Sequence, residues 1–257
     1  VRLLGIPSDN TWIFGFHRAN LRLDVVAVDS LRQKIVLLES YLRQRPMAAG
    51  IIYCATRKHV DKVAALLGPS GCGFSVERYH GGLDEGDRRQ IQDRFMSGQS
   101  RIMVATNAFG MGVDRADLRF VIHFELPGSL EAYYQEAGRA GRDGEPAECT
   151  ILFNYADTRT QNFFIERRSF PVSMPEEMQR KLQSIERARL RDIVRYCYSE
   201  ICRHETVLEY FGESFEDAPC ENCDRCLGHA ALGDPAAILP SAPDSSVTQQ
   251  VPVRSVT

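Results

Sequence analysis

A pair of arginines set among glycines is the part of the sequence best suited to phosphate chemistry. Arg139 and Arg142 stand three residues apart within Gln135–Gly144, which reads QEAGRAGRDG. The small residues allow close backbone packing while the two side chains project side by side. A guanidinium offers a fixed charge and a planar fork that matches phosphate oxygens. The segment predicts a site for phosphoryl transfer. A surface helix with salt-bridged arginines is the alternative, but it does not account for the interleaved glycines.

Four cysteines further along the chain have the spacing of a metal site. Cys202, Cys220, Cys223 and Cys226 follow the pattern C-x17-C-x2-C-x2-C. Two-residue gaps allow a tight turn to present successive thiolates to one ion, and four thiolates suit tetrahedral zinc. Because four protein ligands leave no open position for water, we predict a structural zinc. Its binding would supply folding free energy on the order of 10 kcal/mol.

Other residues near the cluster are weaker candidates for zinc ligands. Cys197 falls in the apolar pattern of a predicted helix, which favours a core position. His204 and His229 are spare ligands that rank below the four cysteines. Buried free cysteines without a metal are the alternative reading of the cluster, which three cysteines within seven residues disfavour.

A row of basic residues is the third chemical feature. Arg180, Arg187, Arg191 and Arg195 are spaced seven, four and four residues apart, so a helix would carry them on one face. Between residues 180 and 195, six basic residues accompany only two acidic ones. A solvated helix face and a contact with the DNA backbone remain equal alternatives. If the stripe binds DNA, Arg187 and Arg191 are the predicted contact residues.

The bulk composition limits the classes of protein that these features can belong to. Apolar residues make up 44%, charged residues 25%, and the net charge is −3, so nucleic-acid binding would have to come from local basic clusters. No apolar run reaches the roughly 18 residues of a membrane helix, and the first residues do not read as a signal peptide. Clustered cysteines favour a reducing intracellular compartment, either cytoplasm and nucleoid or nucleus.

Short apolar strands alternate with helices of about ten residues, which predicts an α/β fold with a mostly parallel sheet. Loops after the carboxyl ends of such strands share one edge, where these sheets bind ligands. The predicted strands are residues 25–28, 50–54, 76–79, 101–105, 119–123 and 149–153. The predicted helices are residues 31–42, 58–67, 84–96 and 129–137.

The composition changes near Pro171. Ser173–Glu176 has the S-x-x-E form of a capping box, so a long helix is expected to follow. Its apolar side would consist of Leu190, Ile193, Val194, Cys197 and Ile201. Beyond residue 230 the chain is rich in Ala, Pro, Ser and Val, which is typical of a flexible tail.

Several of these segments together resemble DNA helicases of the RecQ family. The arginine segment resembles motif VI of superfamily 2 helicases in the form typical of RecQ. Residues 105–114 (ATNAFGMGVD) resemble motif V, and residues 50–57 (GIIYCATR) resemble motif IV. Residues 79–83 (YHGGL) resemble the Y-H-x-G-L segment that follows motif IV.

Two further segments extend the resemblance to residues 14–230. Residues 16–21 (FHRANL) resemble the F-x-R-x-N segment that joins two motor lobes, with Ala19 where proline is common. Residues 202–204 (CRH), 210–213 (YFGE) and the last three cysteines match the RecQ zinc module. The resemblance implies an interlobe lead-in (1–24), a RecA-like helicase C-terminal lobe (25–168), a helical zinc-binding domain (169–230) and a tail (231–257).

The resemblance also implies a role for individual residues. Arg142 would be the arginine finger that reaches the γ-phosphate of ATP, with Arg139 and Gln135 at the same interface. Gly112 and Asp114 would lie near the nucleotide. Single-stranded DNA would be contacted by Arg57, His80 and Thr106, although simple loop packing is the alternative for His80 and Thr106.

An ATP-dependent helicase that moves 3′ to 5′ on single-stranded and forked DNA is the activity that the resemblance implies, in DNA repair, recombination and replication. ATP and magnesium would be shared with a first lobe, because the P-loop and the D-E-x-H motif are absent here and this chain alone is expected to be inactive. A standalone zinc-stabilised nucleic-acid-binding module is the second hypothesis. An RNA helicase lobe is the third, but it does not explain the zinc cysteines.

Overall fold

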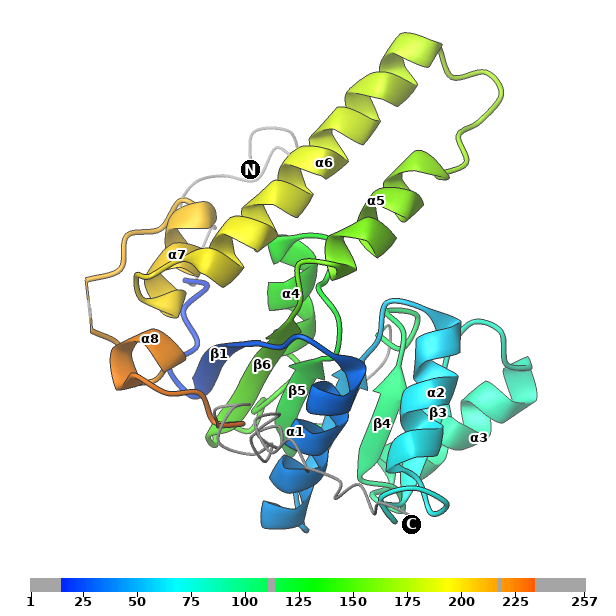
Figure 1. Ribbon diagram of the computed structural model, residues 1–257, viewed down its shortest axis with the longest axis vertical. Helices are drawn as coiled ribbons and strands as arrows, with labels where there is room; N and C mark the ends of the chain where they lie inside the picture. Colours follow the sequence, from blue (N-terminus) through cyan, green and yellow to red (C-terminus); the bar gives the residue numbers. More distant parts are fainter. Residues whose placement is uncertain (1–14, 111–113, 217–218, 234–257) are drawn as a thin grey trace, which may run out of the picture.

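A six-stranded parallel sheet forms the centre of the molecule in the computed structural model, which describes residues 15–110, 114–216 and 219–233 (Figure 1). The strand order is β1-β6-β5-β2-β4-β3, and every neighbouring pair is parallel. The strands are β1 (Leu21–Ala27), β2 (Ala49–Tyr53), β3 (Val76–Tyr79), β4 (Ile102–Ala105), β5 (Leu118–His123) and β6 (Ala147–Phe153). The predicted α/β fold with a parallel sheet is confirmed.

Helices cover both faces of the sheet, because alternate side chains of the buried strands point to opposite sides. One face packs against α1 (Leu31–Gln44) and α2 (Arg57–Leu67). The other face packs against α3 (Glu85–Met96) and α4 (Leu130–Ala137). In β2, Ile52 lies in the first core and Ile51 in the second.

Short polar residues determine where three of these helices begin. Ser30 accepts a hydrogen bond from the Gln33 amide and forms a capping box at the start of α1. Thr56 caps α2 in the same way, and Ser129 caps α4. Because each cap directly follows a strand or its loop, the carboxyl edge of the sheet is also where α1, α2 and α4 start.

Two antiparallel helices form a hairpin that extends away from the sheet (Figure 1). They are α5 (Asp157–Glu166), which was not predicted, and α6 (Glu176–Tyr198). The predicted Ser173 cap is wrong: Pro175 is the N-cap residue of α6, and no side chain caps this end. Leu190, Ile193 and Cys197 are buried as predicted, but Ile201 lies beyond the end of α6 and is 48% exposed.

The zinc-module residues follow as two short helices, α7 (Arg203–Tyr210) and α8 (Asp224–Leu227). After α8 the chain returns to the sheet, where Leu232 is buried and the Ala231 amide donates to the Asp24 carboxylate at 2.7 Å. Packed structure therefore extends past the boundary predicted at residue 231. The rest of the predicted tail, from residue 234, lies outside the described residues.

The first strand also begins earlier than predicted, at Leu21 instead of Val25. Leu21, Leu23 and Asp24 are fully buried, and all of β1 pairs in register with β6. Arg22 and Asp24 interrupt the apolar pattern, so the sequence did not indicate a strand here. Asp24 can be buried in the strand because it pairs with Arg22 at 3.0 Å. No helix in the described ranges has the length and apolar character that crossing a membrane requires.

Candidate nucleotide interface, nucleic-acid edge and zinc centre

The arginine loop, residues 138–145, connects the end of α4 to the start of β6. Its Gly141 amide donates to the Leu118 carbonyl oxygen at 2.9 Å, at the first residue of β5. The loop therefore lies at the amino ends of β5 and β6, opposite to the carboxyl edge, where sequence reasoning expected ligands. This placement arises because α4 runs back across the sheet from its cap at Ser129.

Arg139 joins the arginine loop to the loop after β4. Its guanidinium donates to the Gly110 carbonyl oxygen. A Cβ atom at Gly110 would lie 2.9 Å from Arg139 Nη2, so a side chain there would push the guanidinium away. The same loop is held from β2, where the Tyr53 hydroxyl donates to the Phe109 carbonyl oxygen at 2.9 Å. Burial raises the pKa of Tyr53, so it remains a hydroxyl donor.

The predicted finger and a predicted nucleotide-binding carboxylate lie together. Arg142 Nη1 is 2.7 Å from Asp114 Oδ1, and the two side chains are 37% and 82% exposed. Exposed ion pairs contribute only about 0–1 kcal/mol, so an anionic ligand can compete for this guanidinium. Gln135 is exposed on α4, and Gly112 lies outside the described residues.

The predicted DNA-facing residues lie at the carboxyl edge, after β2, β3 and β4. Arg57 is exposed at the start of α2, and a Cβ atom on Gly82 would lie 3.3 Å from its Cδ. His80 is only 6% exposed, and its ring nitrogens contact the Asp61 carboxylate at 3.2 Å and the Gly82 amide at 3.1 Å. Thr106 is 8% exposed. This geometry favours loop packing for His80 and Thr106, and leaves Arg57 as the accessible phosphate donor.

A cavity of about 390 Å³ lies at the same edge, between the loops after β2 and β5 and the helices α4 to α6. Its lining is mixed in charge and includes His123, Glu125, Glu136, Arg168 and Arg189. His123 Nε2 lies 2.7 Å from Glu136 Oε2. No short motif predicts this cavity, because its lining comes from segments that are up to 136 residues apart.

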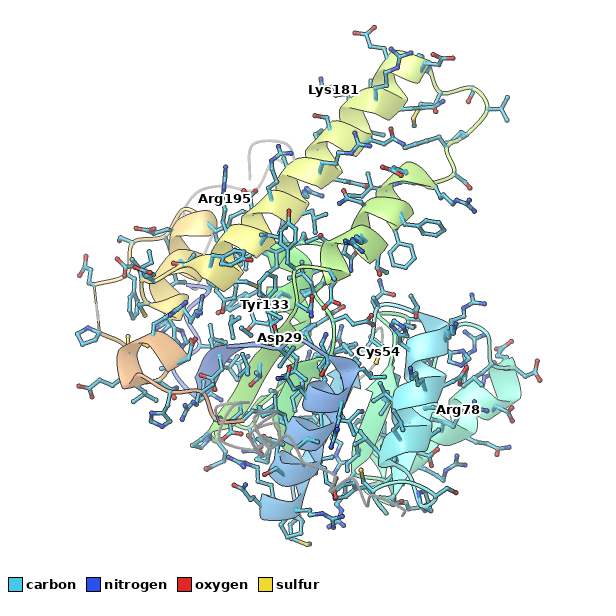
Figure 2. The ribbon with its side chains drawn as sticks, viewed as in Figure 1. Asp29, Cys54, Arg78, Tyr133, Lys181 and Arg195 are labelled. Atoms are coloured by element: carbon cyan, nitrogen blue, oxygen red, sulfur yellow. The ribbon has the colours of Figure 1, made fainter. Side chains whose placement is uncertain are left out.

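The basic stripe occupies the exposed side of α6, away from the residues that pack on the sheet (Figure 2, where Arg195 is labelled). Three of its arginines have acidic neighbours: Arg180 with Glu176 at 2.9 Å, Arg187 with Glu166 at 3.7 Å and Arg195 with Asp192 at 3.2 Å. All these pairs are on the surface, so the stripe stays accessible to a polyanion.

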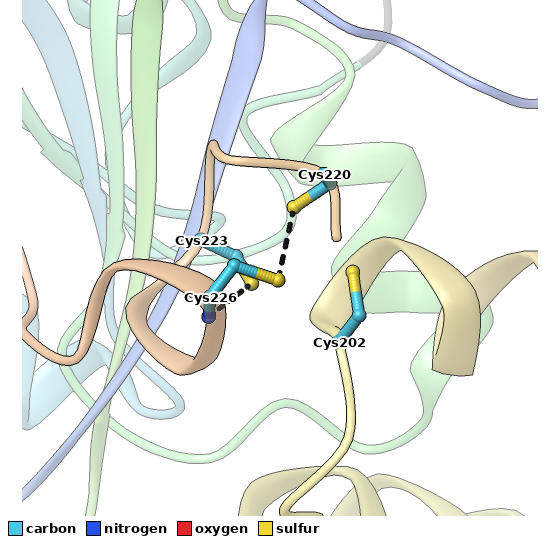
Figure 3. A group of neighbouring side chains, drawn as sticks. All are labelled: Cys202, Cys220, Cys223 and Cys226. Carbon is cyan, nitrogen blue, oxygen red and sulfur yellow. Dashed lines mark hydrogen bonds between the residues drawn. The ribbon is translucent and has the colours of Figure 1, made fainter. Parts of the chain in front are cut away.

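The four predicted zinc ligands converge on one point (Figure 3). Their sulfur atoms all lie within 4.8 Å of one another, and the Cys220 and Cys226 sulfurs are 3.7 Å apart. A tetrahedral ion with Zn–S bonds of about 2.3 Å would place its sulfurs about 3.8 Å apart, so the cluster fits zinc. The cysteines are free thiols, with no disulfide among them.

Local backbone geometry presents these sulfurs. The Cys226 amide contacts the Cys223 sulfur at 3.4 Å, and the Asn222 amide contacts the Cys220 sulfur at 3.4 Å. Cys202 is contributed by a separate segment, the residue before α7.

A buried ion pair that sequence reasoning missed joins the two halves of the cluster. Arg203 is fully buried and donates two hydrogen bonds to Asp224, with Nε–Oδ1 at 2.8 Å and Nη2–Oδ2 at 2.9 Å. Its third nitrogen donates to the Tyr196 carbonyl oxygen in α6. A basic and an acidic residue directly after zinc cysteines were the available signal.

The weaker zinc candidates lie outside the cluster. Cys197 is buried in the core beneath α6, and burial raises its pKa to about 12, so it stays protonated. His204 is buried, its Nε2 contacts the Leu21 carbonyl oxygen at 3.0 Å, and burial lowers its pKa to about 4. His229 contacts the carbonyl oxygen of Leu227 through Nδ1. None of these three residues belongs to the four-cysteine cluster.

Comparison with known protein families finds two matching regions in the chain. Residues 33–144 match the helicase conserved C-terminal domain, and residues 155–227 match the RecQ zinc-binding domain. Among solved structures, Saccharomyces cerevisiae Dbp5 bound to RNA and ADP BeF3 has a TM-score of 0.50 and 21% identity, covering 72% of this chain and 50% of that chain. That likeness concerns the fold alone.

Two curated relatives are more similar in sequence. The ATP-dependent DNA helicase RecQ of Bacillus subtilis is 40% identical over 231 residues, which are 90% of this chain and 36% of that protein. The ATP-dependent DNA helicase hus2/rqh1 of Schizosaccharomyces pombe is 42% identical over 184 residues, covering 71% of this chain and 13% of that protein. The chain thus spans about a third of the first relative and less of the second.

The parallel sheet with its arginine loop and appended four-cysteine cluster defines a helicase C-terminal lobe joined to a zinc-binding domain. The chain belongs to the RecQ family and corresponds to its C-terminal region.

Proposed function

We propose that this chain supplies the second motor lobe and the zinc module of an ATP-dependent DNA helicase that moves 3′ to 5′. The observation that carries the proposal is the arginine loop. It presents the exposed guanidinium of Arg142 beside Asp114, while Arg139 joins it to the loop after β4. This arrangement suits the edge of a nucleotide site that a first lobe completes.

Arg142 acts in this proposal as an arginine finger. ATP, bound mainly by the first lobe, would supply the phosphoryl group that is transferred, and its magnesium ion would neutralise charge on the phosphates. Arg142 exchanges its exposed carboxylate partner for γ-phosphate oxygens, and such fingers contribute about 10³–10⁵ in rate. Arg139 holds the loop after β4 at the same interface through the Gly110 carbonyl oxygen. Gln135, Gly112 and Asp114 complete the interface, with Asp114 suited to a ribose hydroxyl.

Single-stranded and forked DNA are the proposed nucleic-acid partners. Arg57 at the carboxyl edge and the stripe residues Arg187 and Arg191 offer exposed donors to backbone phosphates, which position a strand without reading its sequence. His80 and Thr106 shape the loops between them, because both are largely buried.

Zinc has a structural role in this proposal. Cys202, Cys220, Cys223 and Cys226 hold the ion and thereby join the start of α7 to α8. Cysteine thiols that remain free for zinc are consistent with a reducing intracellular compartment.

Strand separation on tailed duplexes tests this function in the full-length protein. We expect ATP-dependent unwinding of a duplex with a 3′ tail and little unwinding of the same duplex with a 5′ tail. DNA binding without ATP-dependent unwinding of either substrate would contradict the proposal, and would favour a zinc-stabilised binding module.

A further inference from the structure

The lead-in segment, residues 15–20, lies between the arginine loop and the zinc module and contacts both. Its hydrogen bonds reach residues 138–145 on one side and residues 213 and 222 on the other. These contacts span 120 to 203 positions in the sequence, so no local pattern requires them. The segment is therefore a physical connection between two functional parts.

Arg18 binds the carbonyl groups that follow α4. Its guanidinium donates to the carbonyl oxygens of Gly138 at 3.4 Å, Ala140 at 3.2 Å and Gly141 at 2.9 Å. Carbonyl groups after the last turn of a helix lack partners within the helix and carry partial negative charge. One fixed cation thus satisfies three acceptors of the loop that holds Arg139 and Arg142.

Asn20 binds the same loop at its turn. Its amide nitrogen donates to the Gly141 carbonyl oxygen at 2.8 Å and to the Glu145 carbonyl oxygen at 2.9 Å. Gly141 has a φ angle of +55°, and a Cβ atom there would lie 2.5 Å from Asn20 Nδ2. Glycine at this position is required by both the backbone conformation and the close approach of Asn20.

The zinc module holds the other side of the lead-in segment. The Glu213 carboxylate accepts the Phe16 amide at 2.9 Å, and the Phe16 ring stacks on Phe211 with 4.7 Å between centroids. Asn222, which lies between two of the zinc cysteines, donates to the Ala19 carbonyl oxygen at 2.8 Å. Formation of the zinc cluster therefore orders residues that hold the lead-in segment.

We propose that Arg18 and Asn20 are positioning residues for the arginine finger, and that the zinc module keeps them in place through Glu213 and Asn222. By this means the zinc module affects ATP hydrolysis without touching the nucleotide. The inference rests on the proposed function of Arg142. It assigns no contact with ATP to Arg18, whose donors are directed to loop carbonyls and to Asn20.

Hydrogen–deuterium exchange on this chain tests the structural step without ATP. In the wild type, the amides of Gly141 and Gly144 donate to Leu118 and Gly141 carbonyl oxygens at 2.9 and 3.1 Å. We expect Arg18→Ala to exchange faster across residues 139–145, with helix α1 unaffected. Arg89→Ala is the matched control, because Arg89 is a surface arginine that pairs with Glu85 on the same helix, α3, and lies outside the arginine loop.

Steady-state kinetics on the full-length protein test the functional step. A finger displaced by about 1 Å can lower turnover up to roughly 100-fold. We therefore expect Arg18→Ala and Glu213→Ala to lower kcat by about 10-fold to 100-fold while the KM for ATP changes little. Glu213→Gln retains an oxygen that can accept the Phe16 amide, so it is expected to restore most of the turnover.

The results separate this inference from the proposed function. Unchanged exchange and unchanged kcat in Arg18→Ala would overturn the positioning role, even if Arg142→Ala were inactive. Full turnover in Arg142→Ala would overturn the finger assignment and with it the positioning role, whatever the exchange result. Equal loss in Glu213→Gln and Glu213→Ala would overturn the zinc-module connection.

Discussion

Among single residues, Arg203 in the buried ion pair beside the zinc cluster is expected to have a large effect on stability. Arg203 is fully buried, and its guanidinium donates to the Asp224 carboxylate and the Tyr196 carbonyl oxygen. Removal of one partner from a buried pair leaves an uncompensated charge, which generally costs more than the pair contributes. The pair thus joins α7 to α8, and the bond to the Tyr196 carbonyl oxygen joins both to α6.

Arg203→Ala is predicted to lower the free energy of unfolding by about 3–5 kcal/mol, as measured by denaturant titration of the zinc-loaded chain. Arg225→Ala is the control, because Arg225 is 38% exposed and 4.0 Å from the same Asp224 carboxylate. A surface pair of this kind is expected to contribute less than about 1 kcal/mol. Equal effects of the two substitutions would contradict the assigned role of Arg203.

Much of the candidate site could be predicted at the residue scale because its chemistry is encoded in short spacings. The C-x2-C-x2-C spacing and the two arginines among glycines were sufficient to select the cysteine cluster and the loop beside Asp114. His80 and Thr106 show the limit of this approach. Both are buried by loop geometry, and His80 also contacts Asp61, neither of which the sequence encodes locally.

At the scale of elements, α8 depends on the cysteine that begins it. Cys223 is fully buried, caps α8 through the Cys226 amide and forms an isolated β-bridge with Leu23 in β1. Loss of zinc is therefore expected to loosen both α8 and its contact with the sheet.

Cys223→Ser is predicted to reduce bound zinc, measured by elemental analysis, and to lower both solubility and melting temperature. Cys72→Ser serves as the control, because Cys72 is partly exposed near Glu39 and lies outside the cluster. Full zinc occupancy in a folded Cys223→Ser protein would exclude this cysteine as a ligand.

Helix α6 offers a test of the basic stripe. If Arg187 and Arg191 contact phosphates, each alanine substitution should weaken single-strand binding and reduce the slope of log affinity against log salt by about 0.7. Fluorescence anisotropy at several salt concentrations measures this slope. Identical slopes for Arg187→Ala, Arg191→Ala and the control Arg89→Ala would show that the stripe is only a solvated face.

Helix α5, which was not predicted, and the first half of β1, which the predicted strand left out, lack the usual signals. Helix α5 follows β6 closely and has no side-chain cap, and only Thr158 and Ile165 are buried along it. Strand β1 carries a buried Asp24, which breaks its apolar run. By contrast, β2 and β4 are buried throughout and were predicted to within one residue at each end.

At the scale of the whole molecule, the two proposed activities occupy opposite edges of one sheet. The arginine loop lies at the amino ends of β5 and β6, and the proposed DNA-facing residues lie at the carboxyl ends of β2 to β4. The resemblance assigned the residues to these two groups. Only the path of α4 across the sheet reveals that the groups are separated, and this tertiary arrangement is not present in any short segment.

The proposed role of Arg142 in completing an ATP site is tested most directly by DNA-stimulated ATP hydrolysis in the full-length Arg142→Ala protein. We predict a turnover at least about 10³-fold below the wild type, with ATP affinity changed only a few-fold, because a finger stabilises the transition state more than the bound substrate. Arg89→Ala should hydrolyse ATP like the wild type. Near-normal turnover of Arg142→Ala would contradict the assignment of Arg142 as the arginine finger.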